Sequence, residues 1–284
     1  MGRFRRSWEL VKLCWGVLQQ DKELVVFPIV SLICMVVVTA SFIVPGIFTG
    51  YWASVGEGGA GIGVFVLIVL FYLVQYFVII FFNAALICAA RIRLAGGDPT
   101  LGDGLRGAAS HLGAVLGYAA ISATVGLVLS LIREQGGVAG AIFASLGGMA
   151  WNVVTFLAIP VLVVEGVGPV EAIKRSGALL KKTWGEQLIG ASSIGLVFGL
   201  LAMAVGVVGA LLGAVIIGAG AVWAGVAVII IAVIAVLGIS MLGATLHGIY
   251  AAALYGYAVG GDSGVFGADV LGAAFAPKRA RRGL

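Results

Sequence analysis

The chain has very little charge for its length. Only 10% of its 284 residues are Asp, Glu, Lys or Arg, whereas 62% are hydrophobic. A soluble domain carries about 25% charged residues, and so few polar groups could not cover the surface of a fold in water. Lipid is the alternative solvent, and a membrane-spanning helix needs roughly 20 apolar residues. The composition therefore predicts an all-α integral membrane protein.

Cysteine and histidine are equally scarce. The three cysteines, Cys14, Cys34 and Cys88, form no CxxC motif and no Cys/His pair at the spacing of metal ligands. The only histidines are His111 and His247, so a His-rich metal site is excluded. The sequence also has no G-x-S-x-G, H-E-x-x-H or P-loop motif. We therefore expect no disulfide framework, no metal and no cofactor, and we expect that the protein is not an enzyme.

Six apolar runs are long enough to cross a bilayer. They cover residues 24–44, 63–90, 113–132, 138–164, 188–216 and 226–258. The last two are separated at the glycine-rich stretch 218–225, because 187–260 is too long for one helix and suits two. The sequence therefore predicts a polytopic bundle of six transmembrane helices, arranged as three hairpins (24–90, 113–164 and 188–258) within a single membrane domain spanning residues 1–284.

Amphipathic segments alternate with these hairpins. An interfacial helix is predicted at 3–20, two cytoplasmic amphipathic helices at 100–112 and 169–184, and an amphipathic basic tail at 262–284. Each hairpin is thus preceded by one amphipathic helix, which suggests a threefold repeat.

Local signals support the two central amphipathic helices. Thr100 and Asp103 form a T-x-x-D capping signal, and Pro169 suits the first position of a helix. The predicted apolar faces consist of Leu101, Leu105, Ala108 and Leu112 in the first helix, and of Val170, Ile173, Gly177, Leu180 and Trp184 in the second.

Basic residues set the expected orientation. If the N-terminus is cytoplasmic, only Arg133 of the 17 Lys and Arg residues lies on the other side, as the positive-inside rule requires. This distribution predicts a cytoplasmic membrane protein of a prokaryote with both termini in the cytoplasm. The cluster Lys278, Arg279, Arg281 and Arg282 is a candidate for contact with anionic lipids of the inner leaflet.

Two stretches resemble a known group of proteins. The order P-V-L-V-V-E-G-x-G-P-x-E-A-I-x-R-S-x-x-L-x-K-x-x-W, from Pro160 to Trp184, resembles a large group of prokaryotic six-span membrane proteins, which includes the membrane domain of some glycerophosphodiester phosphodiesterases. The opening R-F-x-R-S-W-x-L-x-K, from Arg3 to Lys12, looks like one uncharacterised family of that group. The resemblance implies the six-span topology. It implies no activity, since these motifs are structural landmarks and we expect no phosphodiesterase catalytic domain.

The predicted spans contain no Asp, Glu, Lys or Arg, so their polar residues are uncharged. This disfavours a proton pump or a cation-coupled carrier, which keep ionisable residues within the membrane. By depth, Gln75, Asn83, Asn152 and His247 are expected to face one another in a single polar interior layer. The layer has two interpretations: interhelical hydrogen bonds of about 0.6 kcal/mol each that fix the packing, or the lining of a cavity or substrate path.

Glycine pairs in the fifth span suggest close helix packing. Gly195 and Gly199, like Gly209 and Gly213, have the small-xxx-small spacing that lets helices approach one another. We expect packing within the bundle, with a homodimer seam as the alternative.

Two functional hypotheses follow from these features. The first is a non-enzymatic membrane protein that acts as a scaffold, or binds lipid or a protein partner at the cytoplasmic leaflet. The alternative is a transporter or flippase-like facilitator of a small neutral or lipid-like solute, and an integral membrane enzyme ranks third. Expected partners are anionic inner-leaflet lipids and a protein partner or a second copy of the chain, but not nucleic acid. A carrier needs a cavity between its hairpins, whereas a scaffold does not.

The orientation can be tested by labelling single cysteines in a cysteine-free background. Cysteines near positions 55, 134 and 220 should react with an impermeant reagent from outside the cell, because few basic residues flank these segments. Cysteines near 100, 175 and 280 should react only after the membrane is opened. Labelling at position 175 in intact cells would contradict the six-span topology.

Overall fold

The computed structural model describes residues 12, 14–48, 61–184 and 193–259, and every regular element there is helical. After a helical segment at 14–20, the elements are η1 (Lys22–Val25), α2 (Val26–Phe48), α4 (Ile62–Leu94), α5 (Leu101–Ala109), α6 (Leu112–Gln135), α7 (Gly137–Val154), α8 (Ala158–Glu165), α9 (Pro169–Trp184), α11 (Ser193–Gly218) and α12 (Val222–Ala258). Residues 3–11, residues 188–192 and the tail 262–284, with Lys278, Arg279, Arg281 and Arg282, lie outside the described residues.

Six helical segments in the described ranges are long and apolar enough to cross a membrane: Lys22–Phe48, Ile62–Leu94, Leu112–Gln135, Gly137–Glu165, Val197–Gly218 and Val222–Gly256. This confirms the expectation of six apolar helices. Two predicted boundaries are wrong. α2 continues through Pro45 to Phe48, since membrane helices tolerate proline. The break before α12 shrinks to 219–221, because Gly220, at φ +89°, makes the tight turn alone.

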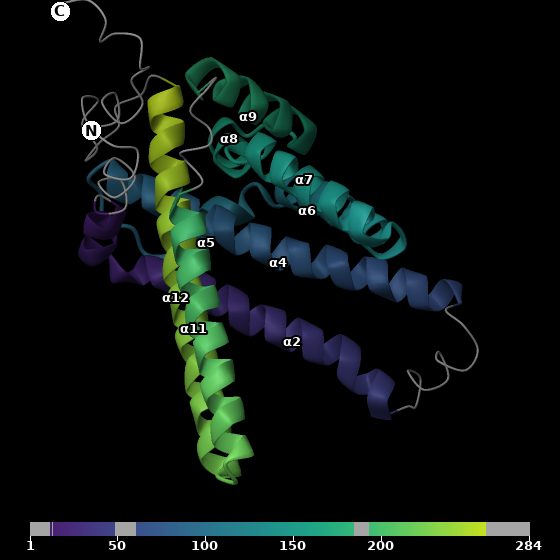
Figure 1. Cartoon of the computed structure of the whole chain (residues 1–284). Coiled ribbons are helices and arrows are strands. Elements are labelled where there is room, and N and C mark those ends of the chain that lie inside the picture. The colour runs from purple at the N-terminus through teal and green to yellow at the C-terminus, as the bar shows by residue number, and fades with distance from the viewer. Residues whose placement is uncertain (1–11, 13, 49–60, 185–192, 260–284) are drawn as a thin grey trace, which may run out of the picture.

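Consecutive long helices pack in pairs. α2 contacts α4, α6 contacts α7, and α11 runs along α12; α12 also contacts α2, α4 and α8. Figure 1 shows the α11/α12 pair crossing the α2/α4 pair and diverging from it. Gly209 and Gly213 allow the close approach of α11 to α12, because a Cβ at these positions would overlap Ala232 and Ile229.

Buried side chains are concentrated at one end of the bundle. The core draws on the stretch 80–94 of α4, the stretch 246–255 of α12, α8, and residues 14–27. We call this the basic end, because Arg91, Arg93, α5 and α9 belong to it. The far ends of the long helices are apolar and exposed; Trp223, for example, is 87% exposed. Such surfaces require lipid as their solvent.

α5 packs on α4 through small residues. Thr100 caps the helix in a reciprocal box with Asp103, and the hydrogen bonds from Thr100 hold the pKa of the Asp103 carboxyl below its ordinary value. A Cβ on Gly104 would lie 2.7 Å from the carbonyl oxygen of Ala85, so only glycine permits this contact. The expected apolar face is therefore wrong in part. Ala108 is fully buried and Leu101 packs against the core, but Leu105 is 37% exposed, and Leu112 begins α6 and is 47% exposed. In lipid the small residues approach their neighbours and leucines can face outward.

The fourth span consists of two helices, although residues 138–164 were expected to form one. α7 ends at Val154 and α8 begins at Ala158. Pro160 gives the physical reason: it has no N–H to donate to the carbonyl of Phe156, and its ring clashes with that carbonyl in a regular helix. The chain turns at residues 155–157 instead.

Ser176 of α9 satisfies the backbone groups that this break exposes. Its hydroxyl donates to the carbonyl oxygen of Val154 at 2.6 Å and accepts the N–H of Leu157 at 3.0 Å. Ser176 is fully buried. Non-helical backbone at membrane depth is tolerated only where protein groups replace the lost hydrogen bonds, so α9 completes the fourth span.

The same contact determines which face of α9 is buried. Ala172, Ser176 and Leu180, one turn apart, point into the protein, whereas Val170 is 55% exposed. The expected apolar stripe is therefore wrong at Val170, because the buried face of α9 includes Ser176, whose two hydrogen bonds require it to point inward beside Leu180.

Replacing Ser176 should destabilise the protein. Ser176→Ala leaves the buried Leu157 N–H and Val154 carbonyl unpaired, at a cost of about 1–3 kcal/mol in the free energy of unfolding measured in detergent. Ser145→Ala is the control, since that hydroxyl bonds only the Ala141 carbonyl on an exposed face of its own helix; its change should stay within about 0.5 kcal/mol. Equal stability of the two variants would contradict the role given to Ser176.

Candidate functional site

A cavity of about 390 Å³ lies where the α2/α4 pair meets the α11/α12 pair. All four helices contribute to its wall: Pro28 and Ser31 from α2, Ile79, Phe82, Asn83 and Leu86 from α4, Gly195, Phe198 and Gly199 from α11, and Ser240, Gly243, Ala244 and His247 from α12. The wall is mostly apolar, and none of the described residues that line it is charged. Its volume falls within the range of small-molecule sites, about 300–1,000 Å³.

Two glycines of α12 allow close helix contacts around this cavity, and two glycines of α11 face open space. A Cβ on Gly243 would lie 2.9 Å from Cβ of Phe198, and one on Gly248 would lie 2.5 Å from Cδ2 of Leu86, so α12 sits tightly against α11 and α4 there. By contrast, a Cβ on Gly195 or Gly199 would meet no atom within 4 Å. The expectation that Gly195 and Gly199 serve helix packing is therefore not met; these two residues leave the cavity open.

Ser31 and Ser240 line the cavity too, but of the four residues predicted to form a polar layer only Asn83 and His247 do so. Both are half-buried, and neither has a hydrogen-bond partner among the described residues. The imidazole of His247 packs edge-to-face on Phe156, with ring centroids 5.0 Å apart and an angle of 85°. Phe156 belongs to the break in the fourth span, so the break supports one wall of the site. A neutral imidazole and an amide can each donate and accept hydrogen bonds, which suits an uncharged polar group.

The other two predicted members of the polar layer lie elsewhere. Gln75 donates from Nε2 to Oγ1 of Thr39 at 2.6 Å and to the carbonyl oxygen of Met35 at 3.3 Å, which links α4 to α2. Asn152 is exposed on α7. The structure therefore forms the Asn83–His247 part of the expected layer and not the whole, because depth along a span does not fix the direction in which a side chain points.

A charged network joins three helices at the basic end. Glu165, the last residue of α8, accepts hydrogen bonds from the guanidinium of Arg175 and, at 3.1 Å, from the hydroxyl of Tyr255 on α12. Arg175 also donates from Nε to Glu171 at 3.0 Å. The bonds to Glu171 and Glu165 hold the pKa of Arg175 above its ordinary value. The sequence analysis did not predict this network. A signal for it was present, because the acidic Glu165 and the basic Arg175 lie on either side of the turn at Gly166.

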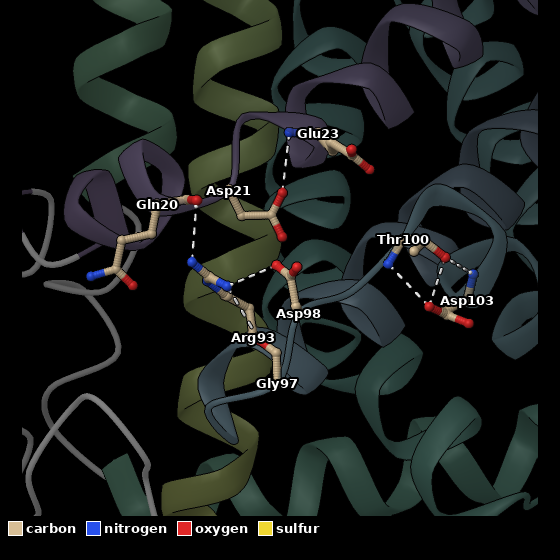
Figure 2. A network of polar contacts seen from close by, with 8 residues as sticks. All are labelled: Gln20, Asp21, Glu23, Arg93, Gly97, Asp98, Thr100 and Asp103. Atoms are coloured by element: carbon tan, nitrogen blue, oxygen red, sulfur yellow. Dashed lines mark hydrogen bonds and ion pairs between the residues drawn. The ribbon is translucent and has the colours of Figure 1, made fainter.

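A second network holds the N-terminal segment against the loop that follows α4. Figure 2 shows Arg93 at its centre. Its guanidinium donates to the carbonyl oxygens of Gln20 at 3.2 Å and Gly97 at 3.3 Å, and pairs with Asp98 at 3.1 Å. The guanidinium of Arg93 thus makes its hydrogen bonds to groups of the protein itself.

Comparison with known proteins gives one match. The model of a family described as a family of unknown function (DUF6159) matches residues 62–266, which is more than two thirds of the chain. No curated protein and no solved structure is significantly similar to the chain. The expected resemblance to the membrane domain of glycerophosphodiester phosphodiesterases is not shown by these comparisons.

Proposed function

The chain belongs to this family of unknown function, and we propose from the geometry that it is a non-enzymatic membrane protein which binds a lipid-like or small neutral solute between its helix pairs. The observation that carries the proposal is the uncharged cavity between α2/α4 and α11/α12. A pure scaffold needs no such space, whereas a binding protein or facilitator does.

The position of the cavity supports entry from the bilayer. Asn83 lies eight residues before Arg91, about 12 Å along α4 at 1.5 Å per residue. The cavity is therefore below the polar boundary of the basic end and within the apolar part of the helices. The two helix pairs that form it contact each other at the basic end and diverge beyond (Figure 1). Movement of one pair against the other would widen or close the cavity, as a facilitator requires.

Filling the cavity should remove the bound solute. Gly199→Leu places a side chain in open space without strain in the backbone. We expect the lipid occupancy of the purified protein, measured by native mass spectrometry after mild delipidation, to fall about tenfold, which corresponds to about 1.4 kcal/mol. Gly238→Leu is the matched control, because Gly238 also faces open space but does not line the cavity. Unchanged occupancy in Gly199→Leu would contradict the proposal.

A second role, association with anionic lipid at the cytoplasmic leaflet, is favoured by the surface of the basic end. Lys174 and Lys181 are exposed on α9, and Arg106 on α5 has 84% of its side chain exposed. Each basic residue near an anionic surface gains about 1 kcal/mol. The tail residues Lys278, Arg279, Arg281 and Arg282 would add to the same surface.

Neutralising the tail should weaken this association. Changing Lys278, Arg279, Arg281 and Arg282 together to Gln should lower the preference for spin-labelled phosphatidylglycerol over phosphatidylcholine at the protein surface, by up to about 1 kcal/mol per residue. Arg133→Gln, a basic residue on the predicted opposite side, should leave the preference unchanged. Equal preference in the tail variant and the wild type would limit the tail to a role in membrane insertion.

A further inference from the structure

We propose that the cavity selects an amphiphile with a single uncharged, hydrogen-bonding head, of the diacylglycerol class, and excludes lipids with a charged head. The head lies against Asn83 and His247, and the first part of one acyl chain lies over Gly195 and Gly199. This inference rests on the proposed function and names the class of solute that the site takes.

Asn83 and His247 define the head, although Ser31 and Ser240 also line the cavity. Asn83 and His247 come from different helix pairs and line the same cavity. Neither hydrogen-bonds to any residue that the structure describes, although polar groups in apolar surroundings are disfavoured unless they are paired. The amide of Asn83 offers two donors and an acceptor, and a neutral imidazole offers one donor and one acceptor. A hydroxyl and an ester carbonyl on one head satisfy both residues at once.

The absence of charge in the wall decides against a phosphate. Within residues 12, 14–48, 61–184 and 193–259, no Asp, Glu, Lys or Arg lines the cavity, and Arg91 lies about 12 Å further along α4. A phosphate at the depth of Asn83 would be an uncompensated charge away from water, which is strongly disfavoured. A neutral head faces no such obstacle.

The apolar part of the wall fits a chain. Gly195 and Gly199 are one turn apart on α11 and face open space, and Ile79, Phe82 and Phe198 line the same cavity. A volume of about 390 Å³ is near the lower end for ligand sites. It therefore holds the head and the beginning of a chain, and the rest of the molecule extends into the lipid between the diverging pairs.

The test compares two lipids that differ only in the head. The full chain in phosphatidylcholine nanodiscs is titrated with dioleoylglycerol and with dioleoyl phosphatidic acid, and binding is followed by native mass spectrometry. We expect dioleoylglycerol to bind at least about tenfold more tightly. Asn83→Leu and His247→Leu should each weaken dioleoylglycerol binding about tenfold, and Asn152→Leu, which changes an exposed asparagine outside the cavity, should not.

The outcomes separate this inference from the proposed function. If both lipids bind equally and Gly199→Leu abolishes both, the cavity binds lipid but the selection for a neutral head is wrong. If neither lipid binds, and Gly199→Leu leaves the lipid occupancy of the purified protein unchanged, the proposed function fails as well. The preference of the wild-type protein decides the question even if a leucine variant does not fold.

Discussion

Two hydrogen bonds of one hydroxyl hold the centre of this structure together. Ser176 donates to the carbonyl of Val154 and accepts the N–H of Leu157, and it thereby completes a transmembrane segment that Pro160 interrupts. Without such a partner the break would leave bare backbone at membrane depth, which lipid does not tolerate. The break in turn places Phe156 against His247. The position of His247 in the cavity wall therefore depends on the hydrogen bonds that Ser176 of α9 makes with the break between α7 and α8.

Side-chain hydrogen bonds connect the elements of the basic end, whereas the helix pairs diverge beyond it. Glu165, Arg175 and Tyr255 connect α8, α9 and α12, and Arg93 connects the N-terminal segment to the loop after α4. Beyond these links the helix pairs diverge (Figure 1). A bundle tied at one end can change its width at the other while these links stay intact, which is the mechanical property that a site between the pairs needs under our proposal.

Charge and polarity are separated in a way that suits two different lipid contacts. The exposed basic residues, such as Lys174 and Lys181, belong to the surface of the basic end, whereas the described residues of the cavity wall are all uncharged. In our proposal the outer surface meets anionic heads and the cavity takes a neutral one. The two contacts are independent, because the exposed cations of the basic end do not belong to the cavity wall.

The sequence by itself determined the six apolar helices, the capping box at Thr100 and the bounds of the helix Pro169–Trp184, because length, composition and end signals are local properties. It also placed Asn83 and His247 at a common depth. Only the tertiary structure decided which faces meet. In lipid a large apolar side chain is about as stable on the outer surface of the bundle as inside it, so small residues and hydrogen bonds determine which faces make contact. Gly104 and Ser176 therefore face inward, and Leu105 and Val170 face outward. Asn152 is exposed and does not join the expected polar layer. The broken fourth span shows the same limit, since Pro160 can interrupt a membrane helix only where another helix supplies the missing partner.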